Sequence, residues 1–402
     1  MIEIETLRKI VDKQKEELKK RDLGIKREIL KNISLKGTHI IILSGMRRSG
    51  KSTLLKQIIK EYKNYYFFNF EDQQAYGFDI FDFNKLDEIF NEKFKSENYF
   101  FDEIQNVEGW ERFIRTLHDN EKKIIVTGSN ASLLSKELGT KLTGRHIRYE
   151  VFPFSYNEMI KLFNKKPNKE TFEEYMSLGG FPEFLKDQRQ ELLQELFNDT
   201  ITRDIVIRYG LKDQKVITNM ATYLITNMGK EFSYNKIKEQ FKLGSVNTVI
   251  SYISYLEDCY LLFTIPKFEF SYKKQLISPK KIYSIDTGVG KAISASYSKD
   301  LGRILENIVF LHLRRKYKEI FYHKEKFECD FIIKDKDKII KAIQVCYDLT
   351  NDNLNREIEG LREAIKRYKL KKGFIITFDQ KDYFGDDIEV VPAWKFLSEN
   401  LV

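Results

Sequence analysis

One short segment limits the folds open to this chain more than any other feature, because it matches the glycine-rich pattern G-x-x-x-x-G-K-S. An apolar run at residues 39–43 predicts a strand before it, and a helix is expected to begin at Lys51. Glycines let the backbone curl so that its N–H groups face an anion, and the amino terminus of a helix favours negative charge. The segment therefore predicts a phosphate cradle for ATP. It consists of Gly45, Met46, Arg47, Arg48, Ser49, Gly50, Lys51, Ser52 and Thr53.

Within this cradle, Lys51 is expected to contact the β- and γ-phosphates, and Ser52 to bind Mg²⁺ through its hydroxyl group. The second half of such a site is an acidic residue at the end of a neighbouring strand. The apolar run that begins at Tyr99 leads directly into Asp102 and Glu103. Asp102 is predicted to hold Mg²⁺, directly or through water, and Glu103 to act as the catalytic base on the attacking water. Two exposed carboxylates after a strand are the alternative, which the position after the cradle disfavours.

Two later segments add further candidates for catalysis. The apolar run at residues 124–127 is followed by small polar residues, among which Asn130 or Ser129 is placed to orient water or to sense the γ-phosphate. A simple loop cap explains these residues equally well. Arg145 precedes a fifth apolar run and is a candidate for stabilising the transferred phosphoryl group, in cis or from a neighbouring subunit. A surface arginine without such a role is the alternative.

The order of the expected elements indicates an α/β fold class. Strands at residues 39–43, 65–70, 99–104, 123–127 and 146–151 alternate mostly with helices, which predicts a parallel sheet covered on both faces. A length of 402 residues suits two or three domains. We divide the chain into an N-terminal helical segment (1–36), a P-loop ATPase core (37–155), a helical lid or linker region (156–227), a winged helix-turn-helix (228–300) and a small α/β domain (301–402).

Composition limits the compartment and the partners only loosely. The net charge of +9 permits binding to nucleic acid, but the basic residues are spread along the whole chain. Three cysteines without a C-x-x-C pattern indicate neither a disulfide framework nor a structural zinc site. The sequence shows no basic-then-apolar leader and no apolar run of about 20 residues, so we expect a cytoplasmic protein with no membrane partner.

The segment from 228 to 290 has the helix–turn–helix–strand–strand order of a winged helix. The expected recognition helix begins at Ser245 and contains no Lys or Arg over residues 246–255. Asn247, Thr248 and Ser251 are its candidates for contacts with DNA. The electrostatic attraction would have to come from Lys236, Lys238, Lys242, Lys273 and Lys274. Packing of this module against other domains or subunits is the alternative.

The motifs of the first 155 residues resemble those of AAA+-type P-loop ATPases of archaea and bacteria, many of which carry a carboxy-terminal domain of unknown function. The resemblance rests on the cradle and on residues 101–105, 127–130 and 142–145, and it extends less specifically along nearly the whole chain. It implies the strand order 5-1-4-3-2 and a homo-oligomeric ring. It also implies roles for Glu103 as catalytic base, Asn130 as sensor and Arg145 as finger or sensor.

The last domain resembles the restriction-endonuclease-like fold. The resemblance places Glu306 as the helix acid, Asp330 as the strand Asp and Gln344 in the following strand. Cys346 stands where that fold has a lysine, and a thiol cannot replace an ammonium group. Lys324, Lys326 and Lys341 are candidates to substitute for it, with nothing to select among them. The resemblance therefore implies a vestigial metal site in an inactive domain used for binding or assembly.

Three functions remain open at this stage. The first is an ATPase that couples turnover to DNA binding or remodelling, on duplex or branched DNA. The second is a nucleotide-dependent regulatory or assembly switch with slow turnover. The third is an ATP-gated, metal-dependent nuclease, against which Cys346 argues.

Overall fold

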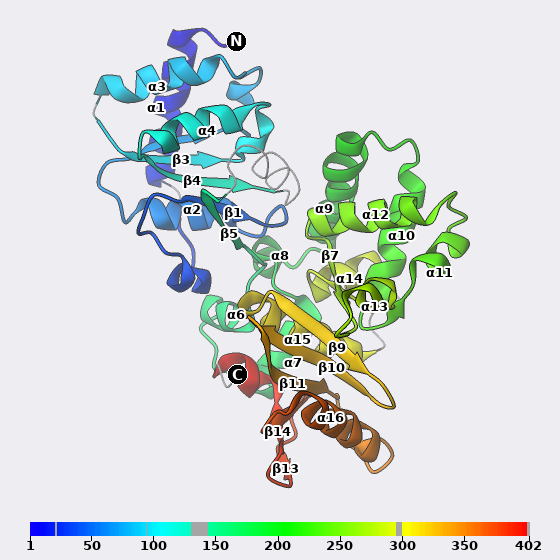
Figure 1. Ribbon diagram of the computed structural model, residues 1–402. Coiled ribbons are helices and arrows are strands. Elements are labelled where there is room, and N and C mark those ends of the chain that lie inside the picture. Colours follow the sequence, from blue (N-terminus) through cyan, green and yellow to red (C-terminus); the bar gives the residue numbers. More distant parts are fainter. Residues whose placement is uncertain (21, 94, 130–143, 295–299, 400–402) are drawn as a thin grey trace. The chain divides into compact units, whose positions relative to one another are not determined.

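The computed structural model describes residues 1–20, 22–93, 95–129, 144–294 and 300–399. It divides into two compact units, Met1–Phe152 and Pro153–Val402 (Figure 1). Among the described residues, no helix combines the length and the apolar character that crossing a membrane requires.

The first unit is built on a five-stranded sheet in which every paired strand is parallel. Its strands are β1 (Ile40–Ser44), β2 (Tyr66–Asn69), β3 (Asn98–Asp102), β4 (Lys123–Gly128) and β5 (His146–Glu150). They lie in the order β2-β3-β4-β1-β5, which is the order that the family resemblance implies. The five strands expected from the apolar runs are confirmed to within one or two residues at each end.

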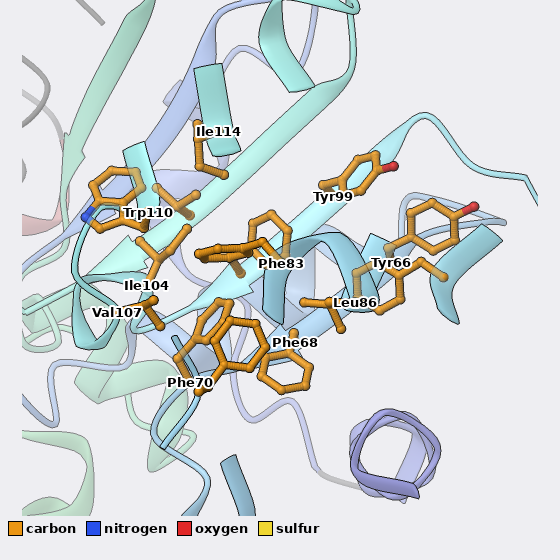
Figure 2. Close-up of a cluster of buried hydrophobic side chains, with 14 of the residues drawn as sticks. Tyr66, Phe68, Phe70, Phe83, Leu86, Tyr99, Ile104, Val107, Trp110 and Ile114 are labelled. Atoms are coloured by element: carbon orange, nitrogen blue, oxygen red, sulfur yellow. The ribbon is translucent and has the colours of Figure 1, made fainter. Parts of the chain in front are cut away.

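Alternate residues of β1 explain how helices cover both faces of this sheet. Ile40 and Ile42 pack into one core cluster, and Ile41 and Leu43 pack into a second. The first cluster holds side chains from three helices and is rich in aromatic rings (Figure 2). The helical elements of the unit are α1 (Ile4–Lys20), η1 (Glu28–Asn32), α2 (Lys51–Ile59), η2 (Gln73–Ala75), α3 (Asp82–Lys93), η3 (Ile104–Asn106) and α4 (Trp110–Asp119).

One local expectation for the first unit is wrong. Apolar spacing after Gly24 predicts a second helix, but only the short 3-10 turn η1 forms there. The side-chain amide of Gln57 donates hydrogen bonds to the carbonyl oxygens of Leu23 and Ile25, at 2.8 and 2.7 Å. Backbone carbonyls bound to α2 in this way are not available for a helix, so tertiary contacts override the local pattern.

The second unit begins with the helices that the sequence predicts. They are α6 (Tyr156–Leu162), α7 (Lys169–Leu178), α8 (Pro182–Asp187), α9 (Gln190–Asp199), the π-helical stretch η4 (Thr200–Ile207) and α10 (Gln214–Thr226). The turn between α7 and α8 requires glycine, because a Cβ atom on Gly180 would lie 2.2 Å from the carbonyl oxygen of Phe154. The N–H of Gly180 donates to the Asp286 carboxylate at 2.6 Å, which joins this turn to a later part of the same unit.

A three-stranded antiparallel sheet follows, in the order β6-β8-β7. Its segment contains β6 (Glu231–Phe232), α11 (Tyr234–Gln240), α12 (Val246–Asp258), β7 (Leu262–Pro266), α13 (Tyr272–Ile277), β8 (Lys280–Ser284) and α14 (Thr287–Ile293). The expected helices and strands of this segment are present. Ser245 caps α12 by accepting a hydrogen bond from the N–H of Thr248 at 3.1 Å.

The unit ends in a mixed six-stranded sheet with the order β13-β14-β12-β11-β10-β9. Its elements are α15 (Leu301–Lys316), β9 (Glu319–Lys324), β10 (Glu328–Asp335), β11 (Lys338–Val345), α16 (Leu354–Tyr368), β12 (Gly373–Thr377), β13 (Asp382–Phe384), β14 (Ile388–Pro392) and α17 (Ala393–Ser398). Apolar runs at residues 329–333, 339–346 and 373–377 predict β10, β11 and β12, but no such run predicts β9, β13 or β14. The α/β fold class is confirmed: a parallel sheet, then helices, then a sheet-containing carboxy-terminal region.

Candidate active site

The glycine-rich segment forms the turn between β1 and α2, at the carboxyl edge of the parallel sheet. A Cβ atom on Gly45 would lie 2.2 Å from the carbonyl oxygen of Val151, so only glycine fits. Gly50, which precedes α2, has a φ of 93° that side chains rarely adopt. Within the described part of the chain, the buried hydroxyl of Ser49 has no hydrogen-bond partner. A tight loop with an unsatisfied polar group before a helix suits the binding of an anion.

Lys51 is the first residue of α2, and its side chain points into the site. Its Nζ atom donates to the carbonyl oxygen of Met46 at 3.2 Å and lies 3.3 Å from Oε1 of Glu103. Lys51 and Glu103 are 4% and 9% exposed. The cradle lysine and the proposed base therefore form a buried ion pair.

Ser52 and Asp102 also come together. The hydroxyl of Ser52 donates to Oδ1 of Asp102 at 3.1 Å, and the hydroxyl of Thr127 donates to the same oxygen at 2.6 Å. Burial and the charge of Glu103 raise the pKa of Asp102 above its usual value, although the two hydroxyl groups oppose the shift. A hydroxyl and a carboxylate at this spacing are hard oxygen donors of the kind that Mg²⁺ requires.

Glu103 adopts a left-handed backbone conformation, with a φ of 53°, immediately after β3. Its N–H donates to Oγ1 of Thr127 at 2.9 Å, and its Oε2 accepts from Gln105 at 2.5 Å. Burial acts to raise the pKa of Glu103, but Lys51, Gln105 and Arg47 lower it below its ordinary value. The backbone strain and these contacts together fix the carboxylate beside the cradle.

Arg27 supports the cradle from behind. This buried side chain donates to the carbonyl oxygen of Ser49 at 2.9 Å and to that of Phe152 at 2.7 Å. Its own N–H donates to Oε1 of Gln57 on α2 at 3.1 Å. The cradle is therefore fastened by a guanidinium group from outside the motif.

Arg145 does not join this cluster. Arg145 precedes β5 at the amino edge of the sheet, where its carbonyl pairs with Ile40, the first residue of β1. The length of β1, roughly 16 Å for its five residues, separates it from the cradle. Its guanidinium group binds Asp119 at 2.7 Å. In this structure the guanidinium group therefore lies away from the cradle of its own chain, and a role for Arg145 in cis or in a neighbouring subunit stays a prediction.

Asn130 lies outside the described residues. Its neighbour Ser129, the other candidate at this position, is buried at the carboxyl end of β4. The hydroxyl of Ser129 accepts a hydrogen bond from Gln105 at 3.4 Å. Gln105 thus joins Ser129 to Glu103.

Sequence reasoning missed Thr127, Gln105 and Arg27. Thr127 and Gln105 stand in the segments 127–130 and 101–105, and both are polar residues at the carboxyl edge of a parallel sheet. That position was a usable signal. Arg27 carried none, because its contacts join residues up to 125 positions apart in the chain.

The second unit brings the predicted vestigial metal residues together around a group that the sequence did not suggest. Glu306 on α15 and Asp330 on β10 both contact the ammonium of Lys281, which comes from β8. Gln344 accepts from the N–H of Asp330 at 3.1 Å. Of the lysines proposed as substitutes, Lys324 contacts Glu328 at 3.2 Å from the edge of the cluster.

Three family models match successive parts of this chain. A family model described as an AAA domain matches residues 37–160. Two models described as domains of unknown function, DUF8612 and DUF4143, match residues 169–300 and 301–396. The first unit is thus a P-loop nucleotide-binding domain of AAA type.

Two relatives align over nearly the full length. Uncharacterized protein MJ1544 of Methanocaldococcus jannaschii is 37% identical over 420 residues, which cover 94% of this chain and 92% of the relative. An uncharacterized protein of Haemophilus influenzae is 29% identical over 389 residues, which cover 90% and 96%.

Solved structures align only weakly. AMPPCP-bound DnaA from Aquifex aeolicus has a TM-score of 0.27 and 18% identity, covering 57% of this chain and 85% of that one. PCH-2 of C. elegans has a TM-score of 0.22 and 16% identity, covering 56% and 64%. Alignments of this strength support no functional comparison.

Proposed function

This chain belongs to the same family as its M. jannaschii relative, and from that premise we propose that it binds ATP with Mg²⁺ and hydrolyses it. The observation that carries the proposal is the convergence of four side chains at one edge of the sheet: Lys51, Ser52, Asp102 and Glu103. They come from two segments about fifty residues apart. No other group of described residues in the first unit offers a cradle, a lysine, hard oxygen donors and a base together.

Each residue has a distinct task in this proposal. The backbone N–H groups from Gly45 to Thr53 surround the phosphates, and Lys51 neutralises charge on the β- and γ-phosphates. Ser52 and Asp102 would hold Mg²⁺, which when bound neutralises charge that develops on the phosphate oxygens. Glu103 accepts a proton from water as the water oxygen bonds to the γ-phosphorus. The bond to the bridging oxygen breaks, which yields ADP and inorganic phosphate.

Steady-state ATP hydrolysis by the purified protein tests this proposal. Lys51→Ala should abolish nucleotide binding or turnover, since the phosphates lose their main cation. Lys60→Ala changes an exposed lysine just beyond α2 and should have no effect. Turnover that survives Lys51→Ala would refute the assignment of the site.

We further propose that ATP hydrolysis is coupled to the binding of DNA. Four of the lysines named for the winged-helix candidate are exposed, on or next to α11 and α13: Lys236, Lys242, Lys273 and Lys274. Exposed cations would supply attraction for phosphate groups. Hydrolysis rates without DNA and with single-stranded, duplex and branched DNA test the idea. Strong stimulation by one form would identify the substrate class.

The second candidate function is a regulatory switch with slow turnover. It is favoured by the buried Lys51–Glu103 pair, in which the base is bound to the lysine that must contact phosphate. The regulatory switch would be supported over the DNA-coupled ATPase if no form of DNA changed the rate of ATP hydrolysis and if the size of the oligomer changed with the bound nucleotide.

We propose a ring-shaped homo-oligomer both for the DNA-coupled ATPase and for the regulatory switch. The position of Arg145 at the sheet edge opposite the cradle favours a role on the ATP of another subunit. Mixing Arg145→Ala with Lys51→Ala should then restore activity, since each variant supplies what the other lacks. Two variants that stay inactive when mixed would argue against a finger in trans.

A further inference from the structure

Three carboxylates in the second unit surround one buried ammonium group. Nζ of Lys281 lies 3.1 Å from Oε1 of Glu306, 2.7 Å from Oε1 of Glu328 and 2.8 Å from Oδ1 of Asp330. The lysine side chain is only 2% exposed. An ammonium has three N–H donors, and each here has a carboxylate oxygen within hydrogen-bond distance. The ammonium is thus completely satisfied by acids from two elements, α15 and β10.

Other donors also bind the carboxylates around Lys281. Oε1 of Glu306 accepts a second hydrogen bond, from the hydroxyl of Tyr283 at 2.7 Å. The other oxygen of Asp330 accepts from the N–H of Val345 at 2.9 Å. The amide of Gln344 is used at both ends, by the N–H of Asp330 and by Glu357. A divalent ion would have to displace the ammonium in order to reach these oxygens.

The residues therefore do not fit the metal that the endonuclease-like resemblance implies. We propose that the Lys281 ammonium is a built-in cation that takes the place of a divalent metal ion in this carboxylate cluster. A lysine in that place offsets part of the negative charge of the acids and joins β8, α15 and β10. It cannot generate a metal-bound hydroxide or hold a phosphate through a metal, which is the chemistry that metal-dependent cleavage requires.

The cluster forms part of the lining of a cavity of about 620 Å³. Around the acids, the lining includes four cationic side chains, Arg303, Lys324, Lys326 and Arg356. Cleavage of nucleic acid in this cavity by the metal-dependent route is therefore blocked while Lys281 is in place.

Removal of the lysine side chain should convert the cluster into a metal site. In the full chain without nucleotide, Lys281→Ala should lower the melting temperature by about 10 °C, because buried carboxylates lose their counter-ion. Mn²⁺ should recover much of that loss, and paramagnetic resonance should count about one Mn²⁺ more per chain than in the unaltered protein. Lys324→Ala, which removes a more exposed lysine from the same cluster, should show neither effect.

Two results would overturn the proposal. One is a Lys281→Ala protein whose melting temperature is unchanged, or is lowered but not recovered by Mn²⁺. The second result would come from Asp330→Asn in the otherwise unaltered chain. This experiment does not depend on folding of the lysine variant. The proposal expects the Mn²⁺ count to be the same with and without this substitution, and loss of one equivalent would show that metal already binds there.

Discussion

The ammonium of Lys51 lies 3.3 Å from the carboxylate of Glu103, and both side chains are buried. The phosphates of a nucleotide would compete with Glu103 for this ammonium. In the proposed function, binding of ATP would weaken the ion pair and release the carboxylate to act on water. The pair would then link occupancy of the cradle to the availability of Glu103 as the base.

Replacement of Glu103 separates these two effects. Glu103→Gln should bind ATP as well as the unaltered protein, or up to about tenfold more tightly, because Lys51 no longer gives up a charged partner. Hydrolysis should fall at least about 100-fold with the loss of the base. Equilibrium binding and steady-state turnover measure the two quantities. Glu97→Gln, at an exposed site, is the control, and normal turnover by Glu103→Gln would show that another group is the base.

Thr127→Val tests the hydroxyl that joins Asp102 to the backbone of Glu103. Valine has nearly the same shape but leaves the buried N–H of Glu103 unpaired and removes a donor from Asp102. Leaving a buried donor unpaired costs about 1–3 kcal/mol, so kcat/KM should fall about 5- to 150-fold. Thr116→Val changes an exposed threonine and should have no effect. Equal kcat/KM values for the two variants would mean that Thr127 does not position the acids.

Arg27→Met tests the support behind the cradle. Methionine keeps the apolar stem but cannot donate to the carbonyl oxygens of Ser49 and Phe152. We expect the KM for ATP to rise about tenfold with a smaller change in kcat, because the loop loses its shape and the reacting groups stay in place. Arg8→Met, which removes a surface ion pair with Glu92, is the matched control. An unchanged KM in Arg27→Met would show that the cradle holds its shape without this side chain.

Asp286 should make the second unit less stable as pH rises. Burial raises the pKa of Asp286 from 3.8 to about 6, although backbone N–H groups of Gly180, Val289 and Gly288 oppose the shift. Because the folded value lies above the unfolded one, the folded chain holds this proton more tightly. The resulting stability, roughly 3 kcal/mol, is complete below the unfolded pKa and is lost as pH rises through about 6.

Urea unfolding between about pH 4 and about pH 7.5 measures this effect. The chain has two tryptophans, so fluorescence in a Trp110→Phe background reports on Trp394 in the second unit. The free energy of unfolding should decline with pH more steeply when Asp286 is present than in Asp286→Asn. Asp187→Asn, at an exposed site, should leave the slope unaltered. Parallel curves for Asp286 and its asparagine variant would contradict the assignment.

Much of the first unit was predictable from sequence because its signals are local. Apolar runs marked all five strands, and the glycine pattern marked the cradle between β1 and α2. Asp102 and Glu103 were found because a parallel sheet gathers the carboxyl ends of its strands at one edge. The same rule explains why Arg145, which precedes its strand, lies at the opposite edge.

The short strands and the cross-chain contacts were not predictable. Strands β13 and β14 have 3 and 5 residues and no strong alternation, so their identity depends on the sheet that they join. The helix expected after Gly24 does not form, and Gln57 instead binds the carbonyl oxygens of Leu23 and Ile25. Such contacts depend on which segments meet in space, and residue spacing does not encode them.

The sequence by itself determined that this chain builds a P-loop sheet with Lys51, Ser52, Asp102 and Glu103 at one edge, because backbone conformation and strand polarity follow from local pattern. Only the tertiary structure decided what those residues contact and which cation lies among the carboxylates of Glu306, Glu328 and Asp330 in the second unit. Lys281 lies 25 and 49 positions from Glu306 and Asp330 in the chain, yet its ammonium sits between their carboxylates. Electrostatic balance inside a protein is set by distances between side chains, and these exist only once the chain has folded.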